Sequence, residues 1–416
     1  MTSICVLGLG YIGLPTAAVL ARAGIEVIGV DVSDRHVDAV NRGELPFAEA
    51  GLAEAVADAV AGGRLRAQKD TPPADVYIVA VPTPFKRGAS GDHEADLSYI
   101  EAAARAIAPQ LAGDELVVLE STSPPGTTEH MAEVIMAQRP DLSVDGSAGR
   151  PLVHFAHCPE RVLPGRIMSE MVSNSRIIGG LTPRAAELAR NLYAVFCEGE
   201  LRLTDARTAE MTKLTENAFR DVNIAFANEL SLVAERLGID VWELIELANL
   251  HPRVNILRPG PGVGGHCIAV DPWFIVSAAP DEARLIRTAR EVNDSKPQHV
   301  IRRVQEAVAD MPSPTIAALG LAFKPDVDDL RESPALAVTR DLAALLPDAK
   351  VLVAEPNITE LPGALAAVPN LAFVDYRTAI GEADAVVLLV DHREFRELDR
   401  ERLAGKRVID TRGTWR

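Results

Sequence analysis

Short apolar runs that end in glycine or in polar turns dominate the first third of the chain. Four of these runs are almost uniformly apolar and cover residues 4–7, 26–30, 76–81 and 116–119. Strands of a parallel sheet are buried on both faces, so they show a continuous apolar pattern rather than an alternating one. A stretch of helical composition lies between the first two runs. The pattern predicts a parallel α/β sheet covered by helices.

A different pattern occupies the middle of the chain. From residue 206 to residue 237 apolar side chains recur at helical spacing without a proline, and Gly238 follows. A helix of this length spans about 50 Å, which is more than one small domain needs. We therefore expect it to bridge domains or to form a subunit interface. Helical stretches at 241–249 and 281–293 follow, and Lys296-Pro297 is predicted to be a joint.

The last third repeats the opening pattern. Apolar runs alternate with helical stretches and cover residues 315–319, 350–354, 385–390 and 407–410. The predicted fold is therefore α/β, and its three parts are an N-terminal Rossmann domain over 1–203, a central helical domain with a long helix over 204–297, and a C-terminal Rossmann-like domain over 298–416.

The first turn carries a dinucleotide-binding fingerprint between two predicted strands. Gly8 makes the tight turn, Gly10 leaves room for a pyrophosphate, and Gly13 lets helix and strand pack closely. Asp31 ends the second strand, where a carboxylate accepts a ribose 2′-hydroxyl and repels a 2′-phosphate, so NAD is the expected cofactor. Asp31 could instead cap the next helix. The predicted cofactor-binding residues of this turn are Gly8, Gly10, Tyr11, Ile12, Gly13, Asp31 and Arg35.

Polar residues follow three later strands. Because ligands of open α/β sheets bind beyond the carboxyl ends of strands, Thr83 and Thr122 are candidates to line the crevice. Ordinary turn chemistry is the alternative for Thr83. Glu160 comes shortly after the apolar run 152–156, where a carboxylate acts on water or substrate. The alternative for Glu160 is an ion pair with Arg161.

A glycine- and proline-rich segment, 259–273, surrounds Cys267. A thiol at the opening of a helical turn lies in a positive field that favours the nucleophilic thiolate, although an inert structural cysteine remains the alternative. Lys213 and Asn217 share one face of the long helix. Their ammonium and amide groups suit a developing alkoxide and a water molecule, respectively. A solvated lysine beside Glu216 is the alternative.

The first turn of the last domain lacks the glycine fingerprint. It contains Lys324, Arg331 and Ser333 instead, which suit the phosphates of a different ligand. A charged surface loop is the alternative, because three aspartates lie in the same turn.

Composition excludes several classes of partner. The net charge of −17 argues against nucleic acid and against an anionic membrane surface. No apolar run reaches membrane-spanning length, and the N-terminus has no basic n-region. The four cysteines show neither metal-ligand spacing nor a disulfide pattern. We expect a reduced, cytoplasmic protein without a metal site.

Together these motifs resemble those of the UDP-sugar 6-dehydrogenases, in the UDP-glucose/GDP-mannose dehydrogenase family. They occur in order through all three predicted domains: Gly8-x-Gly10-x-x-Gly13, Ser121-Thr122-x-Pro124, Cys158-Pro-Glu160-Arg, Glu210-x-x-Lys213-x-x-x-Asn217, Gly264-Gly-His-Cys267-x-x-x-Asp271 and Phe323-Lys324-Pro followed by Arg331-Glu-Ser333.

The resemblance implies an NAD-dependent, four-electron oxidation of a sugar 6-hydroxyl to a carboxylate, with Cys267 as nucleophile and Lys213 as oxyanion stabiliser. Asn217 and Asp271 would position or activate water, with help from Glu160 and Thr122. The family places UDP in the C-terminal domain and forms homodimers, here expected through the central helix. The implied substrate-binding residues are Glu160, Arg161, Lys213, Asn217, Arg253, Gly264, Lys324, Arg331 and Arg412, of which Arg253 would cross the dimer interface.

Within the family, the run 251–276, with His266 and Val270 around Cys267, is similar to the enzymes that oxidise UDP-N-acetyl-D-mannosamine. UDP-N-acetylglucosamine and UDP-glucose are alternative substrates. Two other functions also fit parts of the pattern. A 3-hydroxyacid dehydrogenase of the 6-phosphogluconate type would transfer one hydride without a cysteine, and a non-catalytic NAD-binding sensor would retain only the fold.

Overall fold

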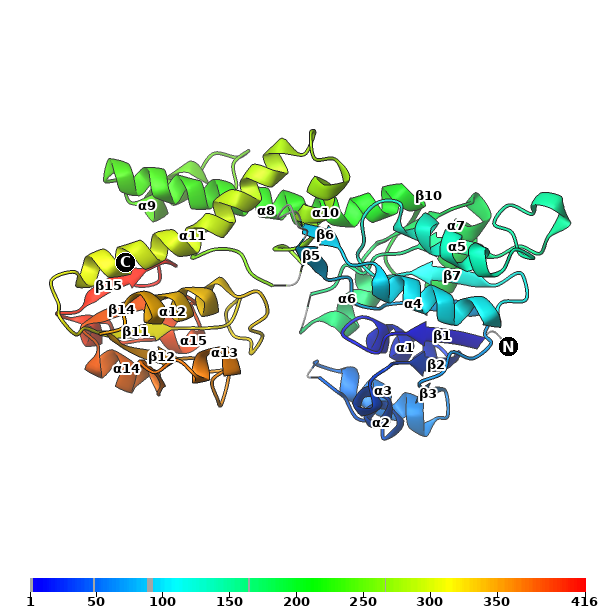
Figure 1. Cartoon of the computed structure of the whole chain (residues 1–416), viewed down its shortest axis with the longest axis horizontal. Helices are drawn as coiled ribbons and strands as arrows, with labels where there is room; N and C mark the ends of the chain where they lie inside the picture. The colour runs from blue at the N-terminus through cyan, green and yellow to red at the C-terminus, as the bar shows by residue number, and fades with distance from the viewer. Residues whose placement is uncertain (1–2, 48, 88–92, 164, 266) are drawn as a thin grey trace. The chain divides into compact units, whose positions relative to one another are not determined.

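The computed structural model describes residues 3–47, 49–87, 93–163, 165–265 and 267–416. The chain divides into two compact units, Met1–Glu216 and Asn217–Arg416, and each contains a sheet of its own (Figure 1). The division falls inside helix α8 (Ala206–Leu237).

The first unit contains an eight-stranded sheet in the order β10-β9-β8-β7-β4-β1-β2-β3. The six neighbouring strands β3, β2, β1, β4, β7 and β8 are parallel. Strand β9 pairs antiparallel with β8, and β10 pairs parallel with β9. In such doubly wound sheets the ligand crevice opens where the strand order reverses, here between β1 and β4. The strands are β1 (Ser3–Leu7), β2 (Glu26–Val30), β3 (Leu65–Gln68), β4 (Val76–Val79), β7 (Leu116–Leu119), β8 (His154–His157), β9 (Arg176–Gly180) and β10 (Leu201–Asp205).

Helices cover both faces of this sheet and bury their apolar sides against it. On one face α1 (Gly13–Arg22), α3 (Leu52–Ala61) and α7 (Pro183–Tyr193) share a core with β1 and β4, and on the other α4 (Ser98–Ile107) and α5 (Thr127–Gln138) do so. The remaining elements are α2 (Asp34–Asn41), α6 (Ile167–Ser173) and a small antiparallel pair, β5 (Phe85–Arg87) with β6 (His93–Ala95).

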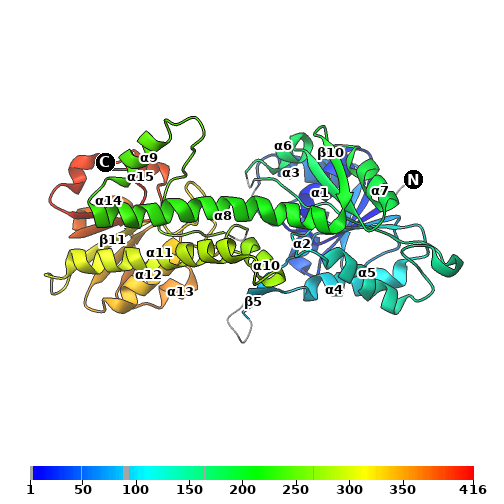
Figure 2. The ribbon, with the colours of Figure 1, turned by 90° about the horizontal axis from the view of Figure 1, so that it is seen from above.

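The second unit contains a five-stranded parallel sheet in the order β13-β12-β11-β14-β15. Helices α11 (Arg284–Val308) and α12 (Pro334–Leu345) pack on one face, and α14 (Tyr376–Glu382) and α15 (Arg393–Arg396) pack on the other. Figure 2 shows the second half of α8 beside α11. The strands and the other helices are β11 (Thr315–Leu319), β12 (Lys350–Ala354), β13 (Leu371–Phe373), β14 (Ala385–Leu388), β15 (Arg407–Asp410), α9 (Val241–Ala248), α10 (Asp271–Ala278) and α13 (Gly363–Ala366).

The predicted fold class is confirmed, and the long helix has the predicted bounds. Two expectations differ from the structure. Strands β3, β9, β10 and β13 and the small pair β5 and β6 were not predicted. The joint expected at Lys296-Pro297 lies inside α11, which runs on to Val308. Buried side chains of α11 lie on both sides of the proline, and those from Val300 to Val308 pack in the core of the second sheet. The predicted domain boundaries at 203 and 297 remain predictions. No helix in the described ranges is long and apolar enough to cross a membrane.

A buried acid lies in the core of the first unit, directly after β7. The carboxylate of Glu120 accepts hydrogen bonds from the Thr16 hydroxyl at 3.0 Å and the Tyr193 hydroxyl at 2.7 Å. Burial raises the pKa of Glu120 to about 7, against the opposing attraction of Arg176. The folded protein therefore favours the neutral carboxyl at acidic pH.

Replacing Glu120 with glutamine is expected to reduce the pH dependence of stability between about pH 4.5 and pH 7. The unfolded chain releases this proton near 4.5, whereas the folded chain keeps it to about 7. The wild type should thus lose stability relative to Glu120→Gln as pH rises through this window, by up to roughly 3 kcal/mol. Urea unfolding at pH 5, 6, 7 and 8 measures the difference. A difference that stays constant with pH would contradict the assignment.

Candidate functional site

The glycine turn after β1 has the geometry that a dinucleotide needs. Gly8 has φ +94°, and a Cβ there would lie 2.6 Å from the Ala80 carbonyl oxygen. A Cβ on Gly13 would lie 1.9 Å from the carbonyl oxygen of Gly8, so only glycine fits this helix–strand contact. Around Gly10, by contrast, no atom lies within 4 Å of an added Cβ. This open position at the N-terminus of α1 suits a pyrophosphate group.

Asp31 follows β2 and fastens the glycine turn. Its Oδ2 accepts the Leu9 amide at 2.8 Å and contacts His36 Nδ1 at 3.2 Å, while Oδ1 accepts the Ser33 amide at 2.9 Å. A carboxylate has about four acceptor positions, so capacity remains for a ribose hydroxyl. Ser33, not Asp31, caps α2. Arg35 is exposed in the first turn of α2.

The turns after β4 and β7 are joined to each other. The hydroxyl of Thr83 donates to the Thr122 carbonyl oxygen at 2.6 Å, and the hydroxyl of Ser121 donates to the Val81 carbonyl oxygen at 2.7 Å. The Thr83 hydroxyl thus donates its proton to a neighbouring turn, which agrees with the alternative of ordinary turn chemistry for this residue. Thr122 is half-buried at the carboxyl end of the sheet.

Glu210 on α8 holds the segment that follows Thr122. Its buried carboxylate accepts the Gly126 amide at 2.6 Å, and the amide and hydroxyl of Thr128 at 2.7 and 2.6 Å. Burial raises the pKa of Glu210, and these hydrogen bonds oppose the rise. The bonds fix the N-terminus of α5 to the helix that carries Lys213 one turn later. The sequence motif contained Glu210, but its anchoring role was not predicted.

Glu160 forms a buried ion pair. The guanidinium of Arg176 on β9 lies 2.8 Å from its carboxylate, and both side chains are at most 5% exposed. The predicted alternative, a pair with Arg161, is wrong: the Arg161 guanidinium pairs with Glu216 at 2.6 Å, and only its backbone amide donates to Glu160. A buried carboxylate needs a buried cation, and Arg176 is the one available there. In this arrangement Glu160 anchors its turn.

The second unit brings together three predicted catalytic residues. Asn217 on α8 donates to Asp271 Oδ2 at 2.5 Å, and Asp271 is the first residue of α10. The amides of Val270 and Asp271 donate to the Cys267 carbonyl oxygen at 3.0 and 2.8 Å. Cys267 therefore lies one turn before α10, with its side chain half-buried.

The four cysteines differ in their surroundings. Cys5 and Cys158 are buried, and burial raises the pKa of each thiol to about 12, so neither is a nucleophile. Cys197 and Cys267 are half-buried. Of these two, Cys267 has a carboxylate and an amide of the predicted site near it in the fold, through Asp271 and Asn217.

The cysteine loop, residues 258–267, packs against the loop that follows β11. A Cβ on Gly264 would lie 2.5 Å from the Glu332 carbonyl oxygen, and one on Gly265 would lie 3.0 Å from the Phe323 ring. The amide of Gly265 also donates to the Arg331 carbonyl oxygen at 3.2 Å. The thiol and the predicted phosphate-binding residues thus lie on adjacent loops.

The predicted substrate cations have different surroundings. Lys324 Nζ is 5.7 Å from the centroid of the Phe323 ring. Arg412 pairs with Asp391 at 2.7 Å, and its guanidinium would meet a Cβ on Gly260 at 2.6 Å, so it lies against the cysteine loop.

Two other predicted substrate residues are exposed. Arg331 pairs with Asp329 at 2.6 Å, as the surface-loop alternative for this turn expected. Arg253 lies in the segment after α9, and its role stays a prediction. His266 lies outside the described residues.

A buried polar chain fixes the start of the cysteine loop. Asn228 on α8 accepts the Gly260 amide at 2.9 Å and donates to Asn293 on α11 at 2.8 Å. Asn293 and Arg290 both donate to Asp221, at 2.8 and 2.7 Å. These residues were missed by the sequence reasoning. The available signal was two polar side chains, Asp221 and Asn228, seven apart on the buried face of the long helix.

Three family models match the chain in succession. They describe the NAD binding domain, the central domain and the UDP binding domain of the UDP-glucose/GDP-mannose dehydrogenase family, and they match residues 2–197, 207–295 and 317–416.

Relatives match over the full length. The chain is 57% identical over 414 residues to the NDP-N-acetyl-D-galactosaminuronic acid dehydrogenase of Ralstonia nicotianae, covering 99% of this chain and 96% of that protein. It is 55% identical over 423 residues to the UDP-N-acetyl-D-mannosamine dehydrogenase of Escherichia coli K12, covering 100% and 99%. A solved UDP-D-ManNAc dehydrogenase from Pyrococcus horikoshii superposes with a TM-score of 0.86 at 38% identity, covering 99% and 96%.

Gly264→Ala is expected to lower the free energy of unfolding by about 1–3 kcal/mol, because its Cβ would overlap the Glu332 carbonyl oxygen and the two loops would have to separate. Gly381→Ala in α14 is the matched control, since no atom lies within 4 Å of its added Cβ. Denaturant unfolding of both variants measures the effect. Equal stability of the two variants would show that the loops do not depend on this contact.

Proposed function

Because the chain belongs to the UDP-glucose/GDP-mannose dehydrogenase family, we propose that it oxidises the 6-hydroxyl of UDP-N-acetyl-D-mannosamine to the carboxylate of UDP-N-acetyl-D-mannosaminuronate. The observation that supports this most directly is the packing of the cysteine loop on the loop of the UDP binding domain that carries Lys324. Because the two loops are adjacent, one bound substrate would contact both the nucleotide-binding loop and the sulfur of Cys267.

The predicted cofactor and enzyme class are confirmed by the family. Residues 2–197 form its NAD binding domain, and the glycine turn with Asp31 fits the pyrophosphate and ribose of NAD. When bound, NAD accepts the hydride that the sugar carbon releases. Gly8, Gly10 and Gly13 would let the backbone approach the pyrophosphate, and Asp31 would accept from the ribose.

Cys267 would carry the covalent part of the reaction. Its thiolate adds to the carbon of the aldehyde formed by the first oxidation, and the carbonyl electron pair moves onto oxygen. The Lys213 ammonium would stabilise that oxyanion. The second oxidation leaves a thioester. Water held by Asn217 and Asp271 then replaces sulfur at the carbon, which releases the carboxylate and restores the thiol. Thr122 and Glu160 would assist the reaction, as the family resemblance implies.

The cations of the second unit would bind the diphosphate. Lys324, Arg331 and Arg412 would be the cationic ligands in a chain whose net charge is −17, and Asp329 and Asp391 pair with the two arginines. Charge-assisted hydrogen bonds from such groups are the strong contacts to phosphate. Binding of UDP would therefore depend on this group rather than on the average field of the protein.

A homodimer through the central helix is part of the proposal. On α8, Phe219, Phe226 and Val233 recur every seven residues and are 70, 56 and 47% exposed. An apolar stripe of this kind on one helix face favours a protein partner over solvent. Arg253, exposed after α9, would reach the substrate of the partner subunit.

A galactosamine sugar is the second candidate substrate, because the relative at 57% identity is named for N-acetyl-D-galactosaminuronic acid. The relatives named for N-acetyl-D-mannosamine are 54 to 55% identical. Relatives named for the two sugars are therefore almost equally identical to this chain in sequence, and a direct comparison of the substrates distinguishes the two candidates.

Two NADH are expected for each UDP-sugar consumed. The purified enzyme is incubated with limiting UDP-N-acetyl-D-mannosamine, UDP-N-acetylgalactosamine, UDP-N-acetylglucosamine or UDP-glucose, and NADH and product are quantified. Highest kcat/KM for the mannosamine sugar would support the substrate assignment. One NADH per sugar would indicate a single-hydride dehydrogenase, and none with all four would indicate a binding protein without this activity.

Cys267→Ser is expected to bind NAD as the wild type does but to lose at least about 10³-fold in kcat, because the thioester route is closed. Cys197→Ser is the matched control, since Cys197 is the other half-buried cysteine and lies outside the proposed site. NADH production and mass spectrometry of the enzyme during turnover measure the effect. Full activity of the Cys267 variant would exclude covalent catalysis.

A further inference from the structure

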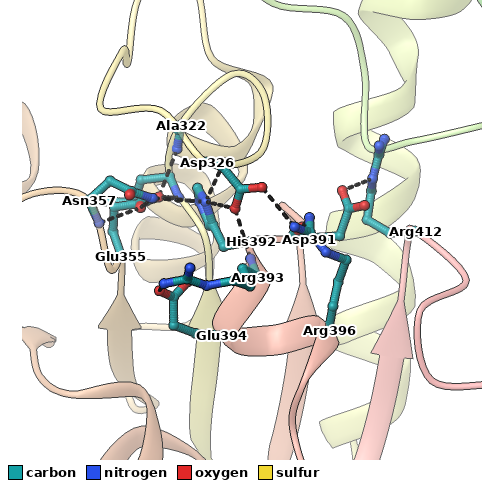
Figure 3. Close-up of polar contacts among 11 residues, drawn as sticks. Ala322, Asp326, Glu355, Asn357, Asp391, His392, Arg393, Glu394, Arg396 and Arg412 are labelled. Carbon is teal, nitrogen blue, oxygen red and sulfur yellow. Dashed lines mark hydrogen bonds and ion pairs between the residues drawn. The ribbon is translucent and has the colours of Figure 1, made fainter.

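The loop that carries Phe323 and Lys324 is held at its start by a buried acid. Glu355 directly follows β12, and its Oε2 accepts the backbone amides of Leu321 and Ala322 at 2.7 and 3.1 Å (Figure 3). The Glu355 side chain is fully buried. A buried carboxylate that accepts two backbone amides is a strong anchor, because leaving any of these groups unpaired is costly.

A buried histidine extends this anchor to the far end of the loop. His392 Nε2 lies 2.8 Å from Glu355 Oε2, and His392 Nδ1 lies 3.0 Å from the backbone nitrogen of Asp326 (Figure 3). A backbone N–H only donates, so Nδ1 must be the acceptor. The Asn357 amide donates to the same Nδ1 at 2.9 Å. The ring is therefore the neutral tautomer that carries its proton on Nε2 and donates it to Glu355.

Asp326 is fixed from a third direction. Its φ of +62° lies in the left-handed region, which aspartate adopts at a cost when its surroundings hold it there. Its Oδ1 accepts the Arg393 amide at 2.8 Å, and its Oδ2 pairs with Arg396 at 2.7 Å. The backbone is thus anchored on both sides of Phe323-Lys324-Pro325.

Two of the three residues between these anchors belong to the proposed site. The Phe323 ring lies against Gly265 of the cysteine loop, and Lys324 is a proposed phosphate ligand. We propose that Glu355 and His392 are positioning residues for the nucleotide. They hold the 321–326 segment so that Lys324 faces the diphosphate and Phe323 supports the cysteine loop. This inference rests on the proposed function of Lys324.

The first unit also has an acid that accepts a backbone amide of a neighbouring turn. Asp31, directly after β2, accepts the Leu9 amide of its own glycine turn, as Glu355 accepts the Leu321 amide. Glu355 also accepts from Ala322, His392 and two nitrogens of Asn357. These five hydrogen bonds exceed the roughly four acceptor positions of a carboxylate, so none is left for a ribose. The second sheet would therefore bind its nucleotide through the side chains of the anchored loop.

Three substitutions of His392 separate its two hydrogen bonds. His392→Phe keeps the ring and removes both. In His392→Asn, Oδ1 replaces Nδ1 and can still accept the Asp326 amide. In His392→Gln, Nε2 replaces the ring Nε2 and can still donate to Glu355, but the Asp326 acceptor is lost. UDP binding to the full-length variants is measured by calorimetry, NADH binding by fluorescence, and KM for the UDP-sugar and for NAD by steady-state kinetics.

We expect His392→Phe to weaken UDP binding and to raise KM for the UDP-sugar by about tenfold, while NADH binding and KM for NAD stay within about twofold. His392→Asn should recover most of the UDP affinity, and His392→Gln should not. The matched control is His299→Phe, which removes another histidine–carboxylate pair, with Glu235 at 2.7 Å, between α11 and α8. It should leave UDP affinity unchanged.

Any of three outcomes would overturn the inference. The His392→Phe variant could bind UDP as tightly as the wild type, the His392→Asn and His392→Gln variants could bind UDP equally, or the His299→Phe control could lose as much UDP affinity as His392→Phe. If His392→Phe does not fold, the comparison of Asn with Gln decides. A wild type that binds no UDP would refute the proposed function itself. A wild type and a His392→Phe variant that bind UDP equally would refute the positioning role alone.

Discussion

The candidate site depends on the close approach of two backbone segments. The cysteine loop lies on the loop after β11 at distances that leave no room for a side chain at Gly264, where an added Cβ would meet the Glu332 carbonyl oxygen at 2.5 Å. Two further contacts fix the cysteine loop, one from Asn228 to Gly260 and one from the first turn of α10 to the Cys267 carbonyl. The backbone around Cys267 is therefore held by α10, which follows it directly, and by two elements distant in sequence, α8 and the loop after β11.

In both sheets a carboxylate holds the turn after the first strand, but the acid is aspartate in one sheet and glutamate in the other. In each, the residue after the second strand accepts an amide from the turn after the first strand, and that bond keeps the turn closed. Aspartate does this in the first unit, next to a glycine turn that leaves open space at Gly10. Glutamate, longer by one methylene, reaches the second turn and is saturated by protein donors. The first turn thus leaves space beside its backbone, whereas the backbone amides of the second turn are bonded to Glu355.

Local patterns carried the prediction of the fold and of the glycine turn. The bounds of α8 followed from apolar periodicity, and the tight turn at Gly8 and the close packing at Gly13 followed from the spacing of the glycines between two strands. The edge strand β10 was missed because it is mostly exposed, so it lacks the apolar run of a buried strand. Its pairing with β9 is a tertiary property.

The anchors of the site were missed for the same reason. Glu160 was expected to pair with its neighbour in sequence, but its partner Arg176 lies on another strand. Asn228 and Asn293 are 65 residues apart, and Glu355 and His392 are 37 apart. Nothing in a local window distinguishes a polar side chain that is buried with a distant partner from one that is solvated.

The proline inside α11 has a consequence for the cysteine loop. Pro297 has no N–H, so the Asn293 carbonyl oxygen, four residues earlier, receives no bond from that position of the helix. Gly262 lies beside this position: a Cβ there would be 3.3 Å from the proline ring and 3.4 Å from the Asn293 carbonyl oxygen. The position of α11 that lacks a backbone donor is thus the one on which Gly262 of the cysteine loop packs.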